Sequence, residues 1–198
     1  LFPSVDDGAK DLQDSLALVQ LAWETGTKRL FLTPHFSHRF KTKSPEWFRE
    51  VFPNIQLSIQ DKFPDMEIYL GSELSYEVDL PELLEKGECM TLNGSRFILL
   101  ELHTRMSRQG IVNAVYEMVR NGFTPILAHV DRFEQFRKED SLADEVMANG
   151  ALIQLNADSV MGKNGFFVKK YCSRLLKENK VHFIASDAHD AVKRPPML

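Results

Sequence analysis

Histidine and carboxylate side chains follow the short apolar runs of this sequence. Six such runs can be recognised, and the residues just past them are His35, Glu73, Glu101, His129, Asn156, and Asp187 with His189. Five of the six runs therefore end in a residue type that binds metal ions. Imidazole and carboxylate without thiolate are typical of Mn²⁺, Zn²⁺ or Fe²⁺ sites rather than of a structural zinc cage. The pattern predicts a metal site at the ends of several strands.

These candidate ligands are too numerous for one ion. Asp7, in Asp6-Asp7-Gly8, adds a further carboxylate near the start of the chain. One cation of this kind takes roughly four to six ligands. Because carboxylates can bridge two ions, we expect two or three ions. Closely spaced ions activate a hydroxide and stabilise an in-line phosphoryl displacement.

Two arginines near these residues would suit an anionic substrate. Arg132 lies three residues past His129, and Arg194 follows Asp187 and His189 in Lys193-Arg194-Pro195-Pro196. A guanidinium group can bind two phosphate oxygens at once. The alternative for each arginine is a solvated position on the surface.

Each candidate ligand also has a structural alternative when it is considered singly. His35 could cap a loop, Glu73 could pair with a lysine, and His129 could be a hydrogen-bonded core histidine. Glu101 follows an apolar run, where a lone buried carboxylate is costly, so it needs a cation or a metal. His103 could reach the same site or face water. Only convergence of these side chains at one place favours the metal site over the alternatives.

The apolar runs predict the strands that must position these side chains. They are short, flanked by Gly, Asn or Lys, and apolar at consecutive positions, which is typical of parallel strands buried on both faces. The six predicted strands are Arg29–Thr33, Glu67–Leu70, Phe97–Leu100, Thr124–Ala128, Ala151–Leu155 and Val181–Ala185.

Helical periodicity fills most of the intervening segments. The predicted helices are Asp11–Glu24, a helix that starts at Ser44-Pro45-Glu46, Gly110–Asn121, Leu142–Met147 and Phe167–Leu176. Pro53 is expected to kink or end the second of these. Alternating strands and helices indicate βαβ units, in which chemistry gathers at the carboxyl ends of the strands. A helix before the first strand indicates that a strand precedes it, so the start of the chain looks clipped.

Composition restricts the class of protein. The chain has 198 residues, of which 43% are hydrophobic and 26% charged, and its net charge is -4. These values exclude a mainly disordered chain and argue against general nucleic-acid binding. No apolar run approaches the roughly 20 residues that span a bilayer, so no membrane insertion is expected. We expect a single domain over residues 1–198, with Cys89 and Cys172 as free thiols in the cytoplasm.

Six motifs recur in the order found in a known superfamily. They are Val5-Asp6-Asp7-Gly8-Ala9-Lys10, Thr33-Pro34-His35, Gly71-Ser72-Glu73-Leu74, Leu100-Glu101-Leu102, Ala128-His129-Val130-Asp131-Arg132 and Ala185-Ser186-Asp187-Ala188-His189. They resemble the polymerase-and-histidinol-phosphatase (PHP) superfamily, and within it the CpsB/YwqE type of manganese-dependent protein tyrosine phosphatases from capsule and exopolysaccharide operons. The resemblance implies an α/β fold, a distorted (β/α)₇ TIM-like barrel. It also implies hydrolysis of phosphotyrosine in the tail of a bacterial tyrosine kinase.

Carried over to this sequence, the resemblance assigns roles to individual residues. The implied metal ligands are Asp7, His35, Glu73, Glu101, His129, Asp187 and His189. Arg132 and Arg194 are implied to bind phosphate, and with Asp7 they are the candidate catalytic residues. The implied cofactor is Mn²⁺, two or three ions, with Fe²⁺ or Zn²⁺ as alternatives, and a hydroxide that bridges the ions would attack phosphorus. Neither cysteine lies in the Cys-x5-Arg loop of cysteine phosphatases.

The sequence departs from the family pattern at its two ends. The His-x-His strand that opens the family is absent before Leu1, and the chain stops at Leu198. We therefore expect a domain truncated at both ends, with the first barrel strand missing. Two other functions stay open: a small-molecule PHP phosphatase of the histidinol-phosphate type, and a non-catalytic module that binds the kinase tail. A homo-oligomer also stays open.

Overall fold

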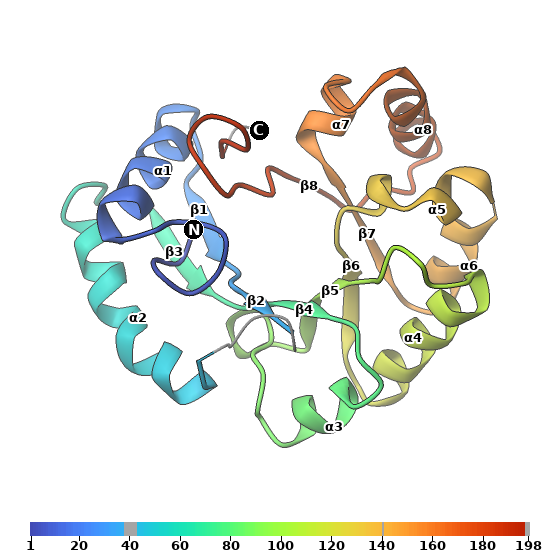
Figure 1. The fold of residues 1–198 in the computed structure, drawn as a ribbon, viewed down its shortest axis with the longest axis horizontal. Coiled ribbons are helices and arrows are strands. Elements are labelled where there is room, and N and C mark those ends of the chain that lie inside the picture. The colour runs from blue at the N-terminus through green and yellow to red at the C-terminus, as the bar shows by residue number, and fades with distance from the viewer. Residues whose placement is uncertain (38–42, 140, 197–198) are drawn as a thin grey trace.

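Parallel strands form an open ring with helices on its outside (Figure 1). The computed structural model describes residues 1–37, 43–139 and 141–196. The strands are β1 (Arg29–Leu32), β2 (His35–Phe36), β3 (Glu67–Leu70), β4 (Glu73–Ser75), β5 (Phe97–Glu101), β6 (Thr124–Leu127), β7 (Leu152–Asn156) and β8 (Phe183–Ala185). The α-helices are α1 (Leu12–Glu24), α2 (Pro45–Gln60), α3 (Leu80–Glu85), α4 (Arg108–Arg120), α5 (Glu134–Lys138), α6 (Leu142–Ala148), α7 (Ala157–Met161) and α8 (Phe166–Lys177). Two 3₁₀ turns, η1 (Leu92–Gly94) and η2 (Val130–Arg132), complete the elements.

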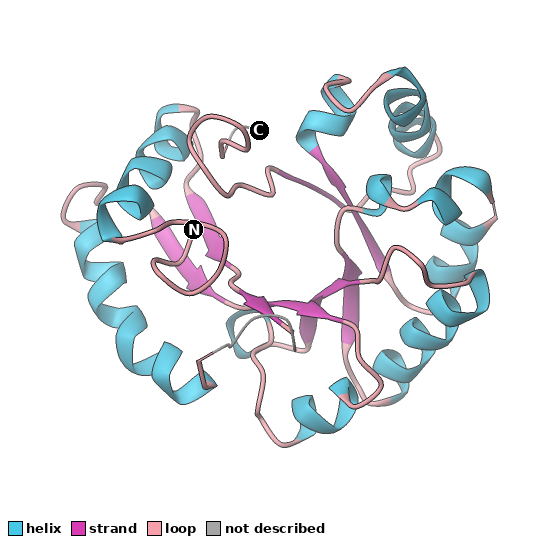
Figure 2. Ribbon diagram, viewed as in Figure 1, coloured by secondary structure: helices cyan, strands magenta, loops and turns pink. Residues whose placement is uncertain are grey.

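The strands line the ring and the helices lie outside them (Figure 2), and from β4 to β8 neighbouring strands follow one another in chain order. β1 pairs with β3, and a second sheet has the order β2-β4-β5-β6-β7-β8, with every pair parallel. Among the described residues, β1 pairs only with β3 and β8 pairs only with β7, so β1 and β8 are edge strands. The parallel α/β architecture agrees with the TIM-like barrel that the sequence predicts.

All six predicted strands are present, with ends that differ by no more than two residues from the expectation. His35 and Glu73 follow β1 and β3 as expected, but they also begin two further short strands, β2 and β4, which the sequence analysis did not predict. Thr33-Pro34 and Gly71-Ser72 separate these from β1 and β3, and Pro34 has no N–H for the ladder. The register nevertheless continues, since Leu32 pairs with Leu70 and His35 with Glu73.

The predicted helices are also present, with small shifts at their ends. Asp11 is the cap of α1 rather than its first residue, and its side chain accepts the N–H of Asp14. Ser44 caps α2 as expected, accepting the N–H of Trp47 at 3.3 Å. The expectation that Pro53 could end this helix is wrong, because α2 continues through it to Gln60. The continuing turns bury Ile55 and Ile59, and this packing offsets the lost backbone hydrogen bond.

Three short helices escaped the sequence analysis. α3, α5 and α7 have six, five and five residues, too few for a 3.6-residue period to show. All three follow strands on the same side of the ring as the candidate ligands, and α7 begins directly after Asn156 at the end of β7. These helices therefore shape the surroundings of the site.

Two groups of buried apolar side chains hold the ring together. The larger group joins β4 to β7 with α3 to α6 and α8, and it includes Ile98, Leu127 and Ile153. The smaller group joins β1 and β3 to α1 and α2, and it includes Leu32 and Phe48. Burial on both faces, as expected for parallel strands, holds in β7, where only Leu152 is partly exposed. The outer strands differ, since β8 is exposed at Phe183 and Ile184.

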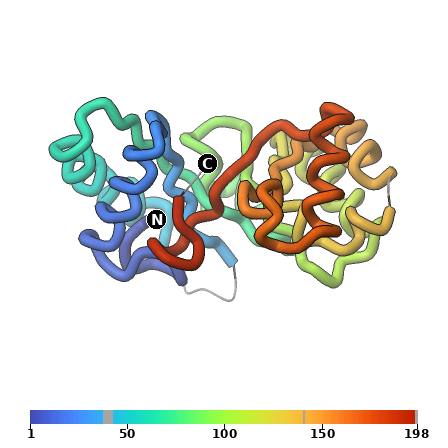
Figure 3. The backbone as a smooth tube through the Cα atoms, turned by 90° about the horizontal axis from the view of Figure 1, so that it is seen from above, coloured from blue at the N-terminus to red at the C-terminus, as the bar shows by residue number. Residues whose placement is uncertain are grey.

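The segment that follows β8 turns back toward the start of the chain (Figure 3). A cavity of about 410 Å³ between β1 and β8 is lined by Leu1, Phe31, Ile184 and Pro196 among others. The return of this segment brings residues from the two ends of the described chain to one place. No helix in the described ranges is long and apolar enough to cross a bilayer.

Candidate metal centre

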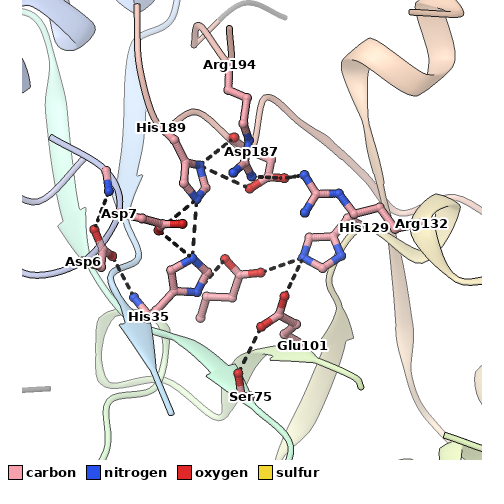
Figure 4. A network of polar contacts seen from close by, with 12 residues as sticks. Asp6, Asp7, His35, Ser75, Glu101, His129, Arg132, Asp187, His189 and Arg194 are labelled. Carbon is pink, nitrogen blue, oxygen red and sulfur yellow. Dashed lines mark hydrogen bonds and ion pairs between the residues drawn. The ribbon is translucent and has the colours of Figure 1, made fainter. Parts of the chain in front are cut away.

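The side chains of the candidate ligands point toward one another at one place in the fold (Figure 4), and Glu73 contacts His35 and His129 among them. They come from six places in the fold: the segment before α1, β2, β4, the last residue of β5, the turn after β6, and the segment after β8. An open cavity of about 360 Å³ is lined by most of them and by both candidate arginines. The structure therefore brings together every residue that the sequence analysis selected for this site.

Glu73 lies at the centre of the group. Its Oε1 atom is 2.8 Å from Nε2 of His129, and its Oε2 atom is 3.7 Å from Nδ1 of His35. Glu73 is only 5% exposed, and its surroundings are imidazole groups rather than the lysine that the sequence left as an alternative. A buried carboxylate between two imidazoles is well placed to bridge cations.

His129 occupies the turn between β6 and η2 in the left-handed region, with φ 35°. Its ring stacks on Phe133 with centroids 5.9 Å apart, and its Nε2 atom faces Glu73 and, at 3.5 Å, Oε1 of Glu101. Its buried Nδ1 atom has no hydrogen-bond partner among the described residues. Burial disfavours the imidazolium form, but the hydrogen bond and charge of Glu73 outweigh it, so the pKa of His129 lies above its ordinary value.

Glu101, at the end of β5, is not an isolated buried carboxylate. Its Oε2 atom accepts a hydrogen bond from Oγ of Ser75 at 3.0 Å, and its side chain is partly exposed. Ser75 pairs with Glu101 in the parallel register of β4 and β5. This hydrogen bond leaves the other carboxylate oxygen directed at His129.

Asp7, His35 and His189 form a second group of candidate ligands. Oδ1 of Asp7 lies 3.4 Å from Nε2 of His35 and 3.5 Å from Nε2 of His189. The two Nε2 atoms are themselves 3.4 Å apart. Asp6 positions this group, because its carboxylate accepts the N–H of His35 at 3.0 Å and that of Gly8 at 3.0 Å.

Asp187 connects the candidate ligands to the arginines. Its Oδ2 atom accepts hydrogen bonds from Arg132, from Arg194 at 2.7 Å and from Nδ2 of Asn156 at 3.0 Å. Its backbone is in the left-handed region, with φ 52°, and its side chain is 6% exposed. Burial opposes ionisation, but the charges of Arg132, His129 and Arg194 outweigh it and lower the pKa of Asp187.

The donor set fits divalent cations of borderline character. Two trios have ligand atoms that all lie within 4.8 Å of one another: Asp7, His35 and His189, and His35, Glu73 and Glu101. All donors are oxygen or imidazole nitrogen, because Cys89 and Cys172 are buried elsewhere as free thiols. Nitrogen and oxygen donors of this kind suit Mn²⁺, Fe²⁺ or Zn²⁺.

Several polar residues around the site were missed or left open by the sequence. His103 lines the same cavity rather than facing only bulk water, with Nε2 3.6 Å from Oε1 of Glu77. Asp6 stands beside Asp7 in the sequence, which was its only signal. Asn156 followed an apolar run at the position of a ligand, but an amide suggested no metal role. No local pattern indicated Ser75 or Glu77.

Comparisons with known proteins indicate the family of this chain. The family model described as "Capsular polysaccharide synthesis, CpsB/CapC" matches residues 1–198. Tyrosine-protein phosphatase CpsB of Streptococcus agalactiae serotype III (strain NEM316) is 30% identical over 200 residues, covering 98% of this chain and 82% of that protein. Tyrosine-protein phosphatase YwqE of Bacillus subtilis (strain 168) is 27% identical over 194 residues, covering 98% and 76%.

Solved structures show the same relationship. A chain from the crystal structures of YwqE from Bacillus subtilis and CpsB from Streptococcus pneumoniae, described as unique metal-dependent tyrosine phosphatases, matches with a TM-score of 0.89 at 27% identity. That match covers 98% of this chain and 78% of the other. Histidinol phosphate phosphatase from Lactococcus lactis matches with a TM-score of 0.55 at 15% identity, covering 84% and 76%, and this shows a shared fold.

Proposed function

The chain belongs to the CpsB/CapC family of capsular polysaccharide synthesis, and from this premise we propose that it is a metal-dependent phosphatase that hydrolyses phosphotyrosine. The observation that carries the proposal is the convergence of seven residues with nitrogen or oxygen donors. Six of them line one open cavity with the two arginines, and the seventh, Glu73, contacts His35 and His129. Its relatives in the family are named tyrosine-protein phosphatases.

The proposed ligands are Asp7, His35, Glu73, Glu101, His129, Asp187 and His189, and the proposed cofactor is two or three Mn²⁺ ions. Such ions, when bound, supply an activated water for attack on phosphorus and neutralise charge in the transition state. Imidazole and carboxylate donors support Mn²⁺, Fe²⁺ and Zn²⁺ alike, so the choice of manganese rests on the family resemblance.

Arg132 and Arg194 are proposed to bind the phosphate group. Their guanidinium groups converge on Asp187 from two directions, and each side chain is partly exposed at the cavity. A phosphate that enters the cavity would meet two preorganised cations without a rearrangement of the backbone. Asp7 is the third proposed catalytic residue. Its half-exposed carboxylate borders the same cavity between His35 and His189.

The proposed substrate is phosphotyrosine in the tail of a bacterial tyrosine kinase that acts in capsule or exopolysaccharide synthesis. The names of the curated relatives support this substrate over the histidinol-phosphate alternative, because the likeness to histidinol phosphatases extends to the fold alone. A cytoplasmic location belongs to the same proposal. It is supported by two cysteines that remain unpaired and buried.

The proposal is tested by comparing substrates and metals on one preparation. Metal-free protein is loaded with Mn²⁺, Fe²⁺ or Zn²⁺, and phosphate release is measured from a phosphotyrosine peptide, a phosphoserine peptide and histidinol phosphate. We expect turnover of the phosphotyrosine peptide that EDTA abolishes and Mn²⁺ restores. Preference for histidinol phosphate would favour the small-molecule alternative, and tight peptide binding without turnover would favour a binding module. The surface variant Glu117→Gln serves as control.

A further inference from the structure

Asp131 is a buried carboxylate that the proposed chemistry does not use. It is 1% exposed, and its two oxygens accept hydrogen bonds from neutral donors, the N–H of Asn156 at 2.8 Å and Oγ of Ser159 at 2.6 Å. Its carbonyl oxygen accepts a hydrogen bond from Arg137 at 2.6 Å. A buried charge is costly unless it is hydrogen-bonded. Since both carboxylate oxygens of Asp131 bind residues of the segment 156–159, we infer that Asp131 positions this segment.

The segment that Asp131 holds leads directly to Asp187. Asn156 is the last residue of β7 and the cap of α7, and its Nδ2 atom donates to Oδ2 of Asp187. Ser159, in the first turn of α7, is 1% exposed and also accepts a hydrogen bond from Asn164 at 2.8 Å. The backbone of Asn156 is thus fixed by Asp131 while its side chain contacts the candidate ligand.

Asp131 also precedes Arg132 in η2, and Arg132 donates to the same oxygen of Asp187. Hydrogen bonds connect Asp131 to Asn156, Asn156 to Asp187, and Asp187 to Arg132. Arg132 in turn is the residue after Asp131 in the chain. The buried carboxylate of Asp131 therefore helps to position Asp187, through Asn156, and Asp131 also precedes Arg132 directly in η2.

Asp187 depends on contacts from other elements, because the strand that precedes it is short and lies at an edge. β8 is a three-residue edge strand, and Asp187 lies two residues beyond it with a positive φ. Asn156 is a neutral donor, so it orients the carboxylate without neutralising the charge that a cation requires. A third arginine in its place, beside Arg132 and Arg194, would compete further with the metal for this charge.

We propose that Asp131, Asn156 and Ser159 form a hydrogen-bonded bracket in which Asn156 is a positioning residue for Asp187. The inference rests on the proposed metal-dependent function. It adds that the bracket sets both metal affinity and turnover by fixing Asp187 relative to Arg132.

The test compares Asn156→Ala with Asn121→Ala as a matched control. The side chain of Asn121 also donates a hydrogen bond through Nδ2, to the carbonyl oxygen of Glu117 at 2.8 Å, but it lies at the end of α4 and lines neither of the two cavities. Three quantities are measured: direct Mn²⁺ binding from the electron paramagnetic resonance signal of the free ion, kcat and KM for a phosphotyrosine peptide, and Tm of the metal-free protein.

We expect Asn156→Ala to weaken Mn²⁺ binding and to lower kcat, each by about 10- to 100-fold, with KM changed less than about twofold. Asn121→Ala should leave Mn²⁺ binding and kcat close to those of the wild type. Ser159→Ala should shift Mn²⁺ binding and kcat in the same direction as Asn156→Ala, and Ser159→Thr should restore them, because threonine keeps the hydroxyl donor. The serine variants carry the test if Asn156→Ala does not fold.

If Asn156→Ala leaves Mn²⁺ binding or kcat unchanged, or lowers Tm alone, the proposal is overturned, because the Asn156 side chain would then not position Asp187 for both metal binding and turnover. The Mn²⁺ readout is separate from the proposed function. A wild type that binds Mn²⁺ without hydrolysing phosphotyrosine would refute that function, while the comparison of Asn156→Ala with wild type would still decide on the bracket.

Discussion

His35 and Glu73 stand opposite each other in the parallel register of β2 and β4, with Nδ1 of His35 3.7 Å from Oε2 of Glu73. They are contributed by two strand segments that resume after matching two-residue interruptions. The pairing of β1 with β3 resumes as that of β2 with β4 after the interruption, and there His35 meets Asp7 and Glu73 meets His129. The central part of the site is thus built on a backbone pairing rather than on a loop.

Replacement of Glu73 tests the proposed metal centre. Glu73→Gln keeps the shape of the side chain but removes the charge that faces His129 and His35. We expect loss of at least one metal equivalent and a fall in phosphotyrosine turnover of more than about 100-fold, since a lost ligand disables the site. Metal analysis and circular dichroism on the same sample check this. Wild-type metal content together with wild-type turnover would remove Glu73 from the ligand set.

Replacement of the arginines tests phosphate binding. Arg132→Ala and Arg194→Ala should each lower kcat/KM for phosphotyrosine about 10- to 100-fold, because a charge-assisted contact contributes about 1.5–3 kcal/mol. Bound metal should change much less than kcat/KM, because both arginines contact Asp187 but neither is itself a proposed ligand. Arg120→Ala, on the exposed face of α4, is the matched control. Equal kinetics in all three variants would show that both arginines are ordinary surface residues.

The two thiols provide a test that separates metal from cysteine chemistry. Burial raises the pKa of both Cys89 and Cys172 from 9.0 to about 12. The folded state therefore binds these two protons more tightly than the unfolded state does. Their contribution to the free energy of unfolding is fully present below pH 9 and is lost as the pH rises toward 12.

Iodoacetamide at pH 8 should therefore leave native protein unmodified and fully active. Mass spectrometry should detect two alkylated cysteines only after unfolding. Rapid inactivation of the native protein, in step with modification of a single thiol, would indicate that a cysteine takes part in catalysis. That result would contradict the proposed metal-dependent chemistry.

Gly71 tests the connection between the fold and the site. A methyl group there would lie 2.7 Å from Cδ2 and 3.3 Å from Cα of Leu92, just before the strand that begins at Glu73. We expect Gly71→Ala to lower the free energy of unfolding by about 1–3 kcal/mol. Gly110→Ala is a control of opposite sign, because its methyl group meets no contact closer than 3.4 Å in α4 and alanine favours the helix by about 0.5–1 kcal/mol. Thermal unfolding of both variants measures the difference, and equal Tm values would show that Leu92 moves aside without cost.

The sequence by itself determined six of the eight described strands, and it selected the residues that the fold brings together at the candidate metal centre. Runs such as Thr124–Ala128 carry their own signal, because a run of four to six apolar residues between turn residues is too short for a typical helix and is typical of a strand buried within a sheet. Since parallel strands place their carboxyl ends at one edge, His129 and Glu101 could be expected to meet there before any distance was known. Local chemistry and chain order were sufficient for that conclusion.

Tertiary structure alone decided how these side chains act on one another. The short strands at His35 and Glu73 form because a neighbouring strand is in register across an interruption, which no local window contains. Helix α2 continues past Pro53 because core contacts distant in sequence outweigh a lost hydrogen bond. The connection of Asp131 through Asn156 to Asp187 spans 56 residues, and its members have ordinary local surroundings. Propensity acts over a few residues, whereas orientation and electrostatic balance depend on neighbours that only the folded chain brings together.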